Sequence, residues 1–166
     1  MGNNRNLDDW HEWLNEWGDR FLLFARQQVS SISDAEDILQ ESIVRIWSNR
    51  EQFKTIGAGL VFTQIRRCAI DHARKVRRRE KREQSYVASL EPALFKPLDS
   101  GLGDDLQQAL QELSPEQQEV LVLKIWGEQT FEAIGQTLDI SPNTAASRYR
   151  YGIEKLRQNL NREATA

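Results

Sequence analysis

The sequence predicts an all-α fold of two small helical domains joined by a flexible linker, and three observations lead to this prediction. Apolar residues recur at intervals of three and four along most of the chain, which is the period of an amphipathic helix. Helix start signals with Ser or Thr caps occur in both halves. Between the halves, Pro92, Pro97, Gly101 and Gly103 interrupt any helical pattern.

The interrupted segment sets the expected domain boundaries. A structureless stretch of about 20 residues is unusual inside one compact domain. We therefore expect a first domain over residues 1–83, a linker over residues 84–104 and a second domain over residues 105–166.

The first domain is expected to contain three helices. In the second helix, Ser33 can cap the exposed amides while Glu36 reaches back to form a capping box. A loop over residues 48–59 then precedes a third helix over about residues 60–83, which is apolar at its start and basic at its end. The apolar stripe of the first helix consists of Leu7, Trp10, Leu14, Trp17, Phe21 and Phe24, and the buried face of the second of Leu39, Ile43, Ile46 and Trp47.

The first helix is rich in tryptophan. Trp10, Trp13 and Trp17 are interpreted as core residues. Alternatively, these three tryptophans partly face a partner protein.

The second domain is expected to contain four helices. The first runs from Leu106 to Leu113, and Ser114 caps the second with Gln117 at the capping-box position. Pro115 lies in its first turn and Gly127 ends it. Thr130 caps a short third helix that contains Phe131, Ile134 and Leu138. A tight turn at Asp139 and Ile140 leads to Ser141, which caps a final helix from Pro142 to about Leu160.

Positive charge is concentrated in two segments, although the formal net charge is −3. Residues 66–82 carry nine basic and two acidic side chains, and residues 142–162 carry five basic side chains and one acidic one. Basic segments attract phosphate groups, while an acidic remainder limits unspecific binding. This distribution indicates a nucleic-acid partner.

Several classes of protein are disfavoured. Cys68 is the single cysteine, so no internal disulfide can form and a cytoplasmic location is expected. His11 and His72 are far apart and have no neighbouring cysteine, so neither a metal nor another cofactor is expected. No apolar run approaches the roughly 20 residues that span a bilayer, so membrane insertion is not expected either.

The chain ends in a short helix, a tight turn and a long basic helix, which is typical of a helix-turn-helix. The second helix of this motif can enter the major groove of DNA, where Arg pairs with guanine and Asn with adenine. We expect Arg148 and Lys155 to hold phosphates. One face of the final helix is small or apolar (Ala145, Tyr149, Gly152, Ile153 and Leu156), and the other presents Asn143, Ala146, Ser147, Arg150 and Tyr151 to DNA. The alternative is a solvated face on an ordinary helical bundle.

Two blocks of sequence resemble known regions of one family. The stretch from Asp34 to Glu41 (DAEDILQE), with Ile46 and Trp47 and then Ala69 to His72 before an Arg-rich helix, resembles region 2 of extracytoplasmic-function (ECF) bacterial sigma factors. The stretch from Leu113 to Gln117 (LSPEQ), with Phe131 to Ile134 (FEAI), Ser141 to Thr144 (SPNT), Ser147 and Arg148, resembles their region 4. The two blocks have the family's order and separation, and they cover most of the chain.

The resemblance implies an alternative sigma factor that binds the core enzyme of RNA polymerase through the β′ coiled coil and the β subunit. It implies promoter DNA as the second partner, single-stranded at the −10 element and duplex at the −35 element, and makes an anti-sigma protein plausible as a third. The implied polymerase-binding residues are Asp37, Gln40, Glu41 and Trp47. For the −10 element they are Phe53, Lys54, Thr55, Arg66, Arg67, Asp71, His72, Arg74 and Lys75, and for the −35 element Asn143, Thr144, Ala146, Ser147, Arg148, Arg150 and Tyr151.

Some positions depart from the family pattern. Leu60 stands where Trp is usual, Arg67 where Asn is frequent, Asp139 where Gly is common and Ala146 where a basic residue is common. These departures affect the details of promoter reading. Asp71 and His72 also have an alternative role, because either side chain can instead form contacts that hold its helix within its own domain.

Two other functions are compatible with parts of the sequence. A conventional regulator that binds duplex DNA would account for the second domain, but it would give the surface formed by Asp37, Gln40 and Glu41 no function. A metal-dependent nuclease would use Asp37, Glu41, Asp71 and His72, but these residues lack recognisable ligand spacing. The sequence therefore predicts a protein that is not an enzyme.

Overall fold

The computed structural model describes residues 7–82 and 103–165. These residues form helices and no strand, which confirms the all-α prediction. They divide into two compact units, one before and one after residues 83–102. The predicted linker lies almost entirely outside the described residues, and Asp104, at its end, already begins a helix.

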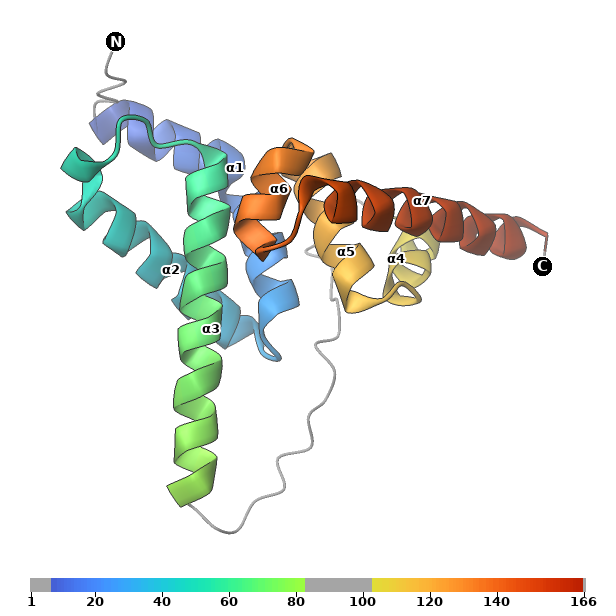
Figure 1. The fold of residues 1–166 in the computed structure, drawn as a ribbon, viewed down its shortest axis with the longest axis horizontal. Helices are drawn as coiled ribbons and strands as arrows, with labels where there is room; N and C mark the ends of the chain where they lie inside the picture. Colours follow the sequence, from blue (N-terminus) through green and yellow to red (C-terminus); the bar gives the residue numbers. More distant parts are fainter. Residues whose placement is uncertain (1–6, 83–102, 166) are drawn as a thin grey trace. The chain divides into compact units, whose positions relative to one another are not determined.

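The first unit consists of α1 (Leu7–Gln28), α2 (Ile32–Ser48), a short 3₁₀ helix η1 (Arg50–Gln52) and α3 (Ala58–Arg82). Each of the three long helices packs against the other two (Figure 1). Their core is aromatic on the α1 side, where the ring of Phe62 in α3 lies 5.0 Å from Phe21 and 5.5 Å from Phe24. Such edge-to-face pairs stabilise a core beyond the area that they bury.

The tryptophans of α1 extend this aromatic cluster. Trp10 is buried, and its ring lies 5.3 Å from Trp13 and 5.5 Å from Trp47 of α2. Trp13 and Trp17 are half-buried, and both pack against Phe21. The core interpretation is therefore right for Trp10, while the other two lie at the edge of the core.

The start and the buried face of α2 differ from the prediction. The N-cap is Ser31 and not Ser33, because the Ser31 hydroxyl accepts the Asp34 amide hydrogen bond at 3.0 Å. The predicted capping box of Ser33 and Glu36 is wrong, since both residues lie inside the helix. The buried residues are Ala35, Ile38, Ser42 and Ile46, whereas Leu39, Ile43 and Trp47 are half-buried at the edge of this face.

The second unit consists of α4 (Asp104–Gln111), α5 (Pro115–Leu121), a π-helical turn η2 (Val122–Trp126), α6 (Phe131–Leu138) and α7 (Pro142–Ala164). The predicted capping box is present, because Ser114 and Gln117 exchange hydrogen bonds at 3.3 Å. Thr130 caps α6 as predicted, with its hydroxyl 3.1 Å from the Ala133 amide. The predicted helix that ends at Gly127 is α-helical only as far as Leu121. It continues as the π-helical turn η2, which the sequence pattern did not predict.

The helix α7 is the centre of the second unit, since it packs against α4, α5 and α6. Near its end, the buried Asn159 side chain donates a hydrogen bond of 3.2 Å to the Ala109 carbonyl of α4. Near its middle, Gly152 lies against α5, where a Cβ atom would be 3.3 Å from the Leu121 side chain. Near its start, the ring of Tyr149 lies 5.7 Å from Phe131 of α6. These contacts hold α7 along its length and leave its opposite face exposed.

Candidate nucleic-acid and protein interfaces

The turn between α6 and α7 has the sharp geometry of a helix-turn-helix. Asp139 adopts the left-handed conformation at φ 56° and ψ 49°, and the Ile140 amide donates to the Gly135 carbonyl at 3.0 Å. The chain returns so closely that a Cβ atom at Gly135 would lie 2.6 Å from the Ile140 carbonyl oxygen. The turn therefore requires glycine at position 135, which sequence analysis missed.

The first turn of α7 is capped by Ser141. Its hydroxyl accepts the Thr144 amide hydrogen bond at 3.1 Å and lies 2.8 Å from the Thr144 hydroxyl. Thr144, one of the predicted −35 residues, is thus engaged in the cap. The exposed Asn143 lies beside it, at a helix N-terminus where the positive end of the dipole favours phosphate.

The remaining predicted −35 residues lie on the outer side of α7. Arg150 and Tyr151 are exposed, the latter to 61%, and Ala146, Ser147 and Arg148 are half-buried. The Arg150 guanidinium lies 5.2 Å from the centre of the Tyr151 ring, so the two side chains form a cation–π pair. On the opposite side, Ala145, Gly152 and Leu156 are buried, and Tyr149 and Ile153 are half-buried. The predicted division of α7 therefore agrees with the burial of Ala145, Gly152 and Leu156 and the exposure of Arg150 and Tyr151, while burial does not distinguish the half-buried residues of the two faces.

Three of the four predicted polymerase-binding residues of α2 share one exposed face. Asp37, Gln40 and Glu41 are all exposed, and Val44 lies on the same face at helical spacing. The Val44 side chain is 62% exposed, which sequence analysis missed. Trp47 lies apart from this face, packed against Trp10 and under the guanidinium of Arg50 at 4.6 Å.

An ion-pair chain joins this face of α2 to α3. Arg45 forms a close ion pair with Glu41 one turn earlier and a second one with Asp71 of α3 at 3.4 Å. His72 of α3 lies 3.5 Å from the Asp34 carboxylate of α2. Both Asp71 and His72 therefore have partners within their own unit, which is the alternative role considered for them.

The basic residues predicted for the −10 element are in two environments. Arg66 donates a hydrogen bond to the Gln28 side chain and so links α3 to α1. Arg67, Arg74 and Lys75 are exposed. Among the loop residues Lys54 and Thr55 are exposed, whereas Phe53 is half-buried directly after η1.

Two arginines of the first unit have shifted pKa values. Burial lowers the pKa of Arg26 in α1, and the charge of Glu36 in α2 partly offsets this effect. The pKa of Arg45 is raised, first by the charge of Cys68 and then by its hydrogen bonds and charge interactions with Asp71 and Glu41. Both guanidinium groups remain charged, so they act as fixed positive charges between the helices.

The described part of the chain shows neither a metal centre nor a membrane span. Within residues 7–82 and 103–165, no three His, Cys, Asp or Glu side chains gather as metal ligands would. In the same residues no helix is both long and apolar enough to cross a membrane.

Comparison with protein families and known proteins agrees with this architecture. Residues 14–79 match the family model of sigma-70 region 2, and residues 109–158 match that of sigma-70 region 4. The first match covers most of α1–α3 and the second covers the helices around α7.

Curated relatives are named as sigma factors. The ECF RNA polymerase sigma factor SigE of Mycolicibacterium smegmatis is 29% identical over 96% of this chain, which spans 64% of that relative's length. RNA polymerase sigma factor CarQ of Myxococcus xanthus is 32% identical over 82% of this chain and 80% of its own. RNA polymerase sigma-E factor of Streptomyces coelicolor is 26% identical over 92% of this chain and 86% of its own.

A solved structure shares the fold. The sigma factor RpoE from Bartonella quintana, crystallised in complex with the anti-sigma factor NepR, has a TM-score of 0.64 and 21% identity to this chain. The match covers 93% of this chain and 98% of that one. With the two matched regions and the identity to CarQ, the chain belongs to the RNA polymerase sigma factors, in their extracytoplasmic-function class.

Proposed function

We propose that this chain binds the core enzyme of RNA polymerase and directs it to a specific set of promoters, as an alternative sigma factor without enzymatic activity of its own. The observation that carries this proposal is that one chain contains both matched regions, in order, on two separate units. A regulator that acts alone on duplex DNA needs the second unit but not the first.

The core enzyme docks on the exposed face of α2, in this proposal. Asp37, Gln40 and Glu41 provide polar and negative groups around the apolar Val44. An exposed apolar side chain within a charged rim is typical of a protein interface. The basic partner is the coiled coil of β′, and the β subunit is the second contact of the core enzyme. Trp47 anchors the end of α2 to α1 through its packing on Trp10.

The −35 element is read by α7 in the major groove. Arg150 and Asn143 are the exposed side chains suited to guanine and adenine, and Ser147 is short enough for close approach. Arg148 holds a phosphate and Thr144 fixes the first turn. Ala146 and Tyr151 contribute apolar contact at the edges of this surface.

The −10 element is opened and held by the loop before α3 and by α3 itself. Phe53, Lys54 and Thr55 lie together in the loop and form the pocket for an unstacked base. Arg67, Arg74 and Lys75 provide exposed charge along α3 for the single strand. Arg66, Asp71 and His72 hold α3 against α1 and α2, which positions these charges.

An anti-sigma protein is a further proposed partner, since the structurally similar RpoE was crystallised with one. The proposed location is the cytoplasm, where the core enzyme and the DNA are available.

Purification with core enzyme and run-off transcription on genomic fragments test the function. We expect the chain to co-purify with core enzyme and to start transcripts at a limited set of sites. Asp37→Lys should abolish core binding, while Asp19→Lys, the same change at an exposed position of α1, should leave it intact. A chain that footprints duplex DNA tightly alone and never binds core enzyme would instead be a conventional regulator.

A further inference from the structure

The direction of the second half of α3 depends on charged contacts with α2. Every residue from 73 to 82 is exposed, and Figure 1 shows this half extending past the contact with α2. Directly before it, Asp71 lies 3.4 Å from Arg45 and His72 lies 3.5 Å from Asp34. These two pairs therefore hold α3 at the point where its support by α2 ends.

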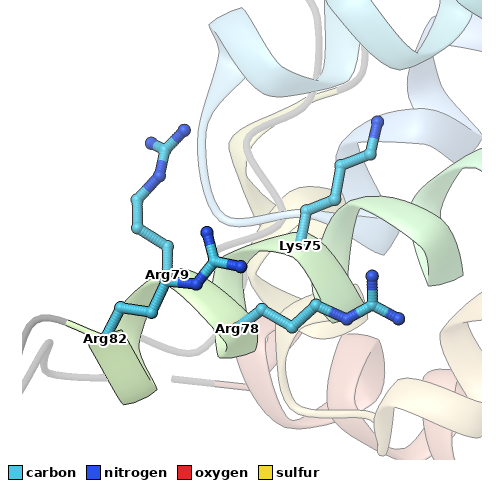
Figure 2. A pocket seen from close by; sticks show the side chains of 4 residues that line it. All are labelled: Lys75, Arg78, Arg79 and Arg82. Carbon is cyan, nitrogen blue, oxygen red and sulfur yellow. The ribbon is translucent and has the colours of Figure 1, made fainter.

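Small rotations at Asp71 are magnified along the exposed helix. From Asp71 to Arg82 the helix rises about 16 Å, so a rotation of about 5° at Asp71 displaces Arg82 by about 1.4 Å. Arg74, proposed above to face the −10 strand, lies on this segment. An open pocket on the same segment is lined by Lys75, Arg78, Arg79 and Arg82 (Figure 2). The contacts of Asp71 thus affect where all of these cations lie.

Arg45 joins Asp71 to the proposed docking face of α2. Its Nη2 atom forms a close ion pair with Glu41, and its Nη1 atom lies 3.4 Å from Oδ2 of Asp71. A guanidinium has donors on separate nitrogens in a fixed plane, so it can contact two carboxylates at once. Glu41 is exposed on the face that also contains Asp37 and Gln40. A single side chain therefore connects the docking face with α3.

The two contacts of Arg45 are unequal. The pair with Glu41 is close, whereas the 3.4 Å to Asp71 exceeds the roughly 2.7–2.9 Å that is usual for a hydrogen bond between charged groups. The side chains of Arg45, Glu41 and Asp71 are 40%, 44% and 45% exposed, so the two ion pairs contribute little to stability. Both pairs can therefore rearrange easily. A cation that approaches Glu41 repels Arg45 and shifts it toward Asp71.

We propose that Arg45 is a positioning residue that couples docking of the core enzyme at Glu41 to the placement of α3 for the −10 element. The proposal rests on the sigma-factor function above. A basic side chain of the core enzyme pairs with Glu41, Arg45 moves fully onto Asp71, and the exposed half of α3 is held in one direction. The chain then binds the −10 single strand more tightly in the holoenzyme than alone. By linkage, the single strand raises the affinity for core enzyme by the same factor.

The test compares Arg45→Lys, Asp71→Asn and their combination in the full chain. Lysine retains the charge of Arg45, but its single ammonium group cannot contact both carboxylates with the same fixed geometry. The matched control is Asp34→Asn, which removes the other charged contact between α2 and α3 and leaves Arg45 unchanged. Circular dichroism of each variant establishes that the helices are retained.

The measurement is a coupling factor. The probe is a single-stranded oligonucleotide that contains the −10 element of a promoter recovered by run-off transcription. Its affinity is measured for the free chain and for holoenzyme, with core enzyme alone as the background, and the coupling factor is the ratio of the two affinities.

The two single variants should lose the coupling and not the binding surface. Since couplings between sites are typically about 5-fold to 150-fold, Arg45→Lys and Asp71→Asn should each lower the factor by about fivefold or more. The affinity of the free chain for the strand should stay the same. The double variant should lose no more than either single variant, because both substitutions interrupt one connection. Asp34→Asn should leave the factor nearly unchanged.

Several outcomes would overturn the role of Arg45. Additive losses in the double variant, or an equal loss for Asp71→Asn in the free chain and in holoenzyme, would mean that Asp71 contacts the strand itself. An equal loss for Asp34→Asn would assign the effect to the general packing of α3. An unchanged factor for Arg45→Lys, in a wild-type chain that binds core enzyme, contradicts the coupling alone. A wild-type chain that binds no core enzyme contradicts the proposed function, and the coupling with it.

Discussion

At the scale of single residues, two glycines have opposite surroundings. A Cβ atom at Gly135 would lie 2.6 Å from the Ile140 carbonyl, whereas one at Gly18 in α1 would meet nothing within 4 Å. Because the backbone at Ile140 cannot move without opening the turn, Gly135→Ala should lower the free energy of unfolding by roughly 1–3 kcal/mol. Gly18→Ala should raise it by about 0.5–1 kcal/mol, since alanine is the better helix former. Urea titrations of both variants, followed by circular dichroism, measure these opposite changes in the free energy of unfolding.

Arg150 carries the most specific residue-level prediction for DNA reading. Its guanidinium is exposed on α7 and held over the Tyr151 ring. A bidentate contact to guanine contributes about 1–3 kcal/mol of discrimination, so Arg150→Ala should reduce −35-dependent transcription by roughly 5-fold to 150-fold. Binding to core enzyme should be unchanged. Arg150→Lys should restore little, because an ammonium group cannot form the planar pair. Equal losses of core binding and transcription would contradict the assignment.

Tertiary partners of single side chains could not be predicted from the sequence. The charges of Asp71 and His72 were equally consistent with contacts to DNA and with contacts inside their own unit. Their partners in the structure are Arg45 and Asp34 of α2, which the sequence pattern of α3 does not reveal. Arg66 is similar, since its partner Gln28 is 38 positions away. The exposure of Asp37, Gln40 and Glu41 was predictable, because it follows from the period of one helix.

At the scale of elements, the capping residues determine how accurately the start of a helix can be predicted from the sequence. Ser114, Thr130 and Ser141 each have a hydrogen-bonded cap as predicted. For α2 the prediction is two residues late: Ser33 had the local signal of a capping box with Glu36, but the helix begins at Ile32 and is capped by Ser31. The π turn Val122–Trp126 has no local signature either, because side chains of this composition also continue an α-helix.

The cap of α7 gives a prediction that separates stability from DNA binding. Ser141→Ala removes the acceptor of the Thr144 amide and should cost about 1 kcal/mol of unfolding free energy. Ser141→Asp restores the cap, and its charge favours the helix N-terminus, so stability should recover. The same charge repels a nearby phosphate, so duplex affinity should stay low for Ser141→Asp. Thermal unfolding and a duplex titration of both variants measure the two effects, and recovery of both by aspartate would exclude a phosphate at this terminus.

At the scale of the whole molecule, the two units contain different fluorophores. Trp10, Trp13, Trp17 and Trp47 lie in the first unit, and Trp126 lies in the second. Tryptophan emission therefore reports mainly the first unit, while circular dichroism reports both. If the units unfold separately, Gly135→Ala should shift the unfolding transition seen by circular dichroism and leave most of the tryptophan signal in place. A single transition, shifted equally in both signals, would mean that the units unfold as one.

The two helical units and their basic segments were predictable from the sequence, because charge and helix periodicity are properties of contiguous segments. Residues 66–82 and 142–162 both present exposed cations, as their composition predicted. The grouping of Lys75, Arg78, Arg79 and Arg82 on one open side of α3 depends on where the contact with α2 ends, and that end is a property of the packed unit.

The contact at Gly152 has a consequence for how α7 presents its outer surface. Without a Cβ atom, α7 lies directly on Leu121, and the two helix axes can approach to the short end of the range for packed helices. A larger side chain at position 152 would act as a wedge and tilt the whole reading surface, so Asn143 and Arg150 would reach a groove at different depths. In the proposed complex, the depth at which α7 enters the groove would thus depend on a buried residue of its inner face.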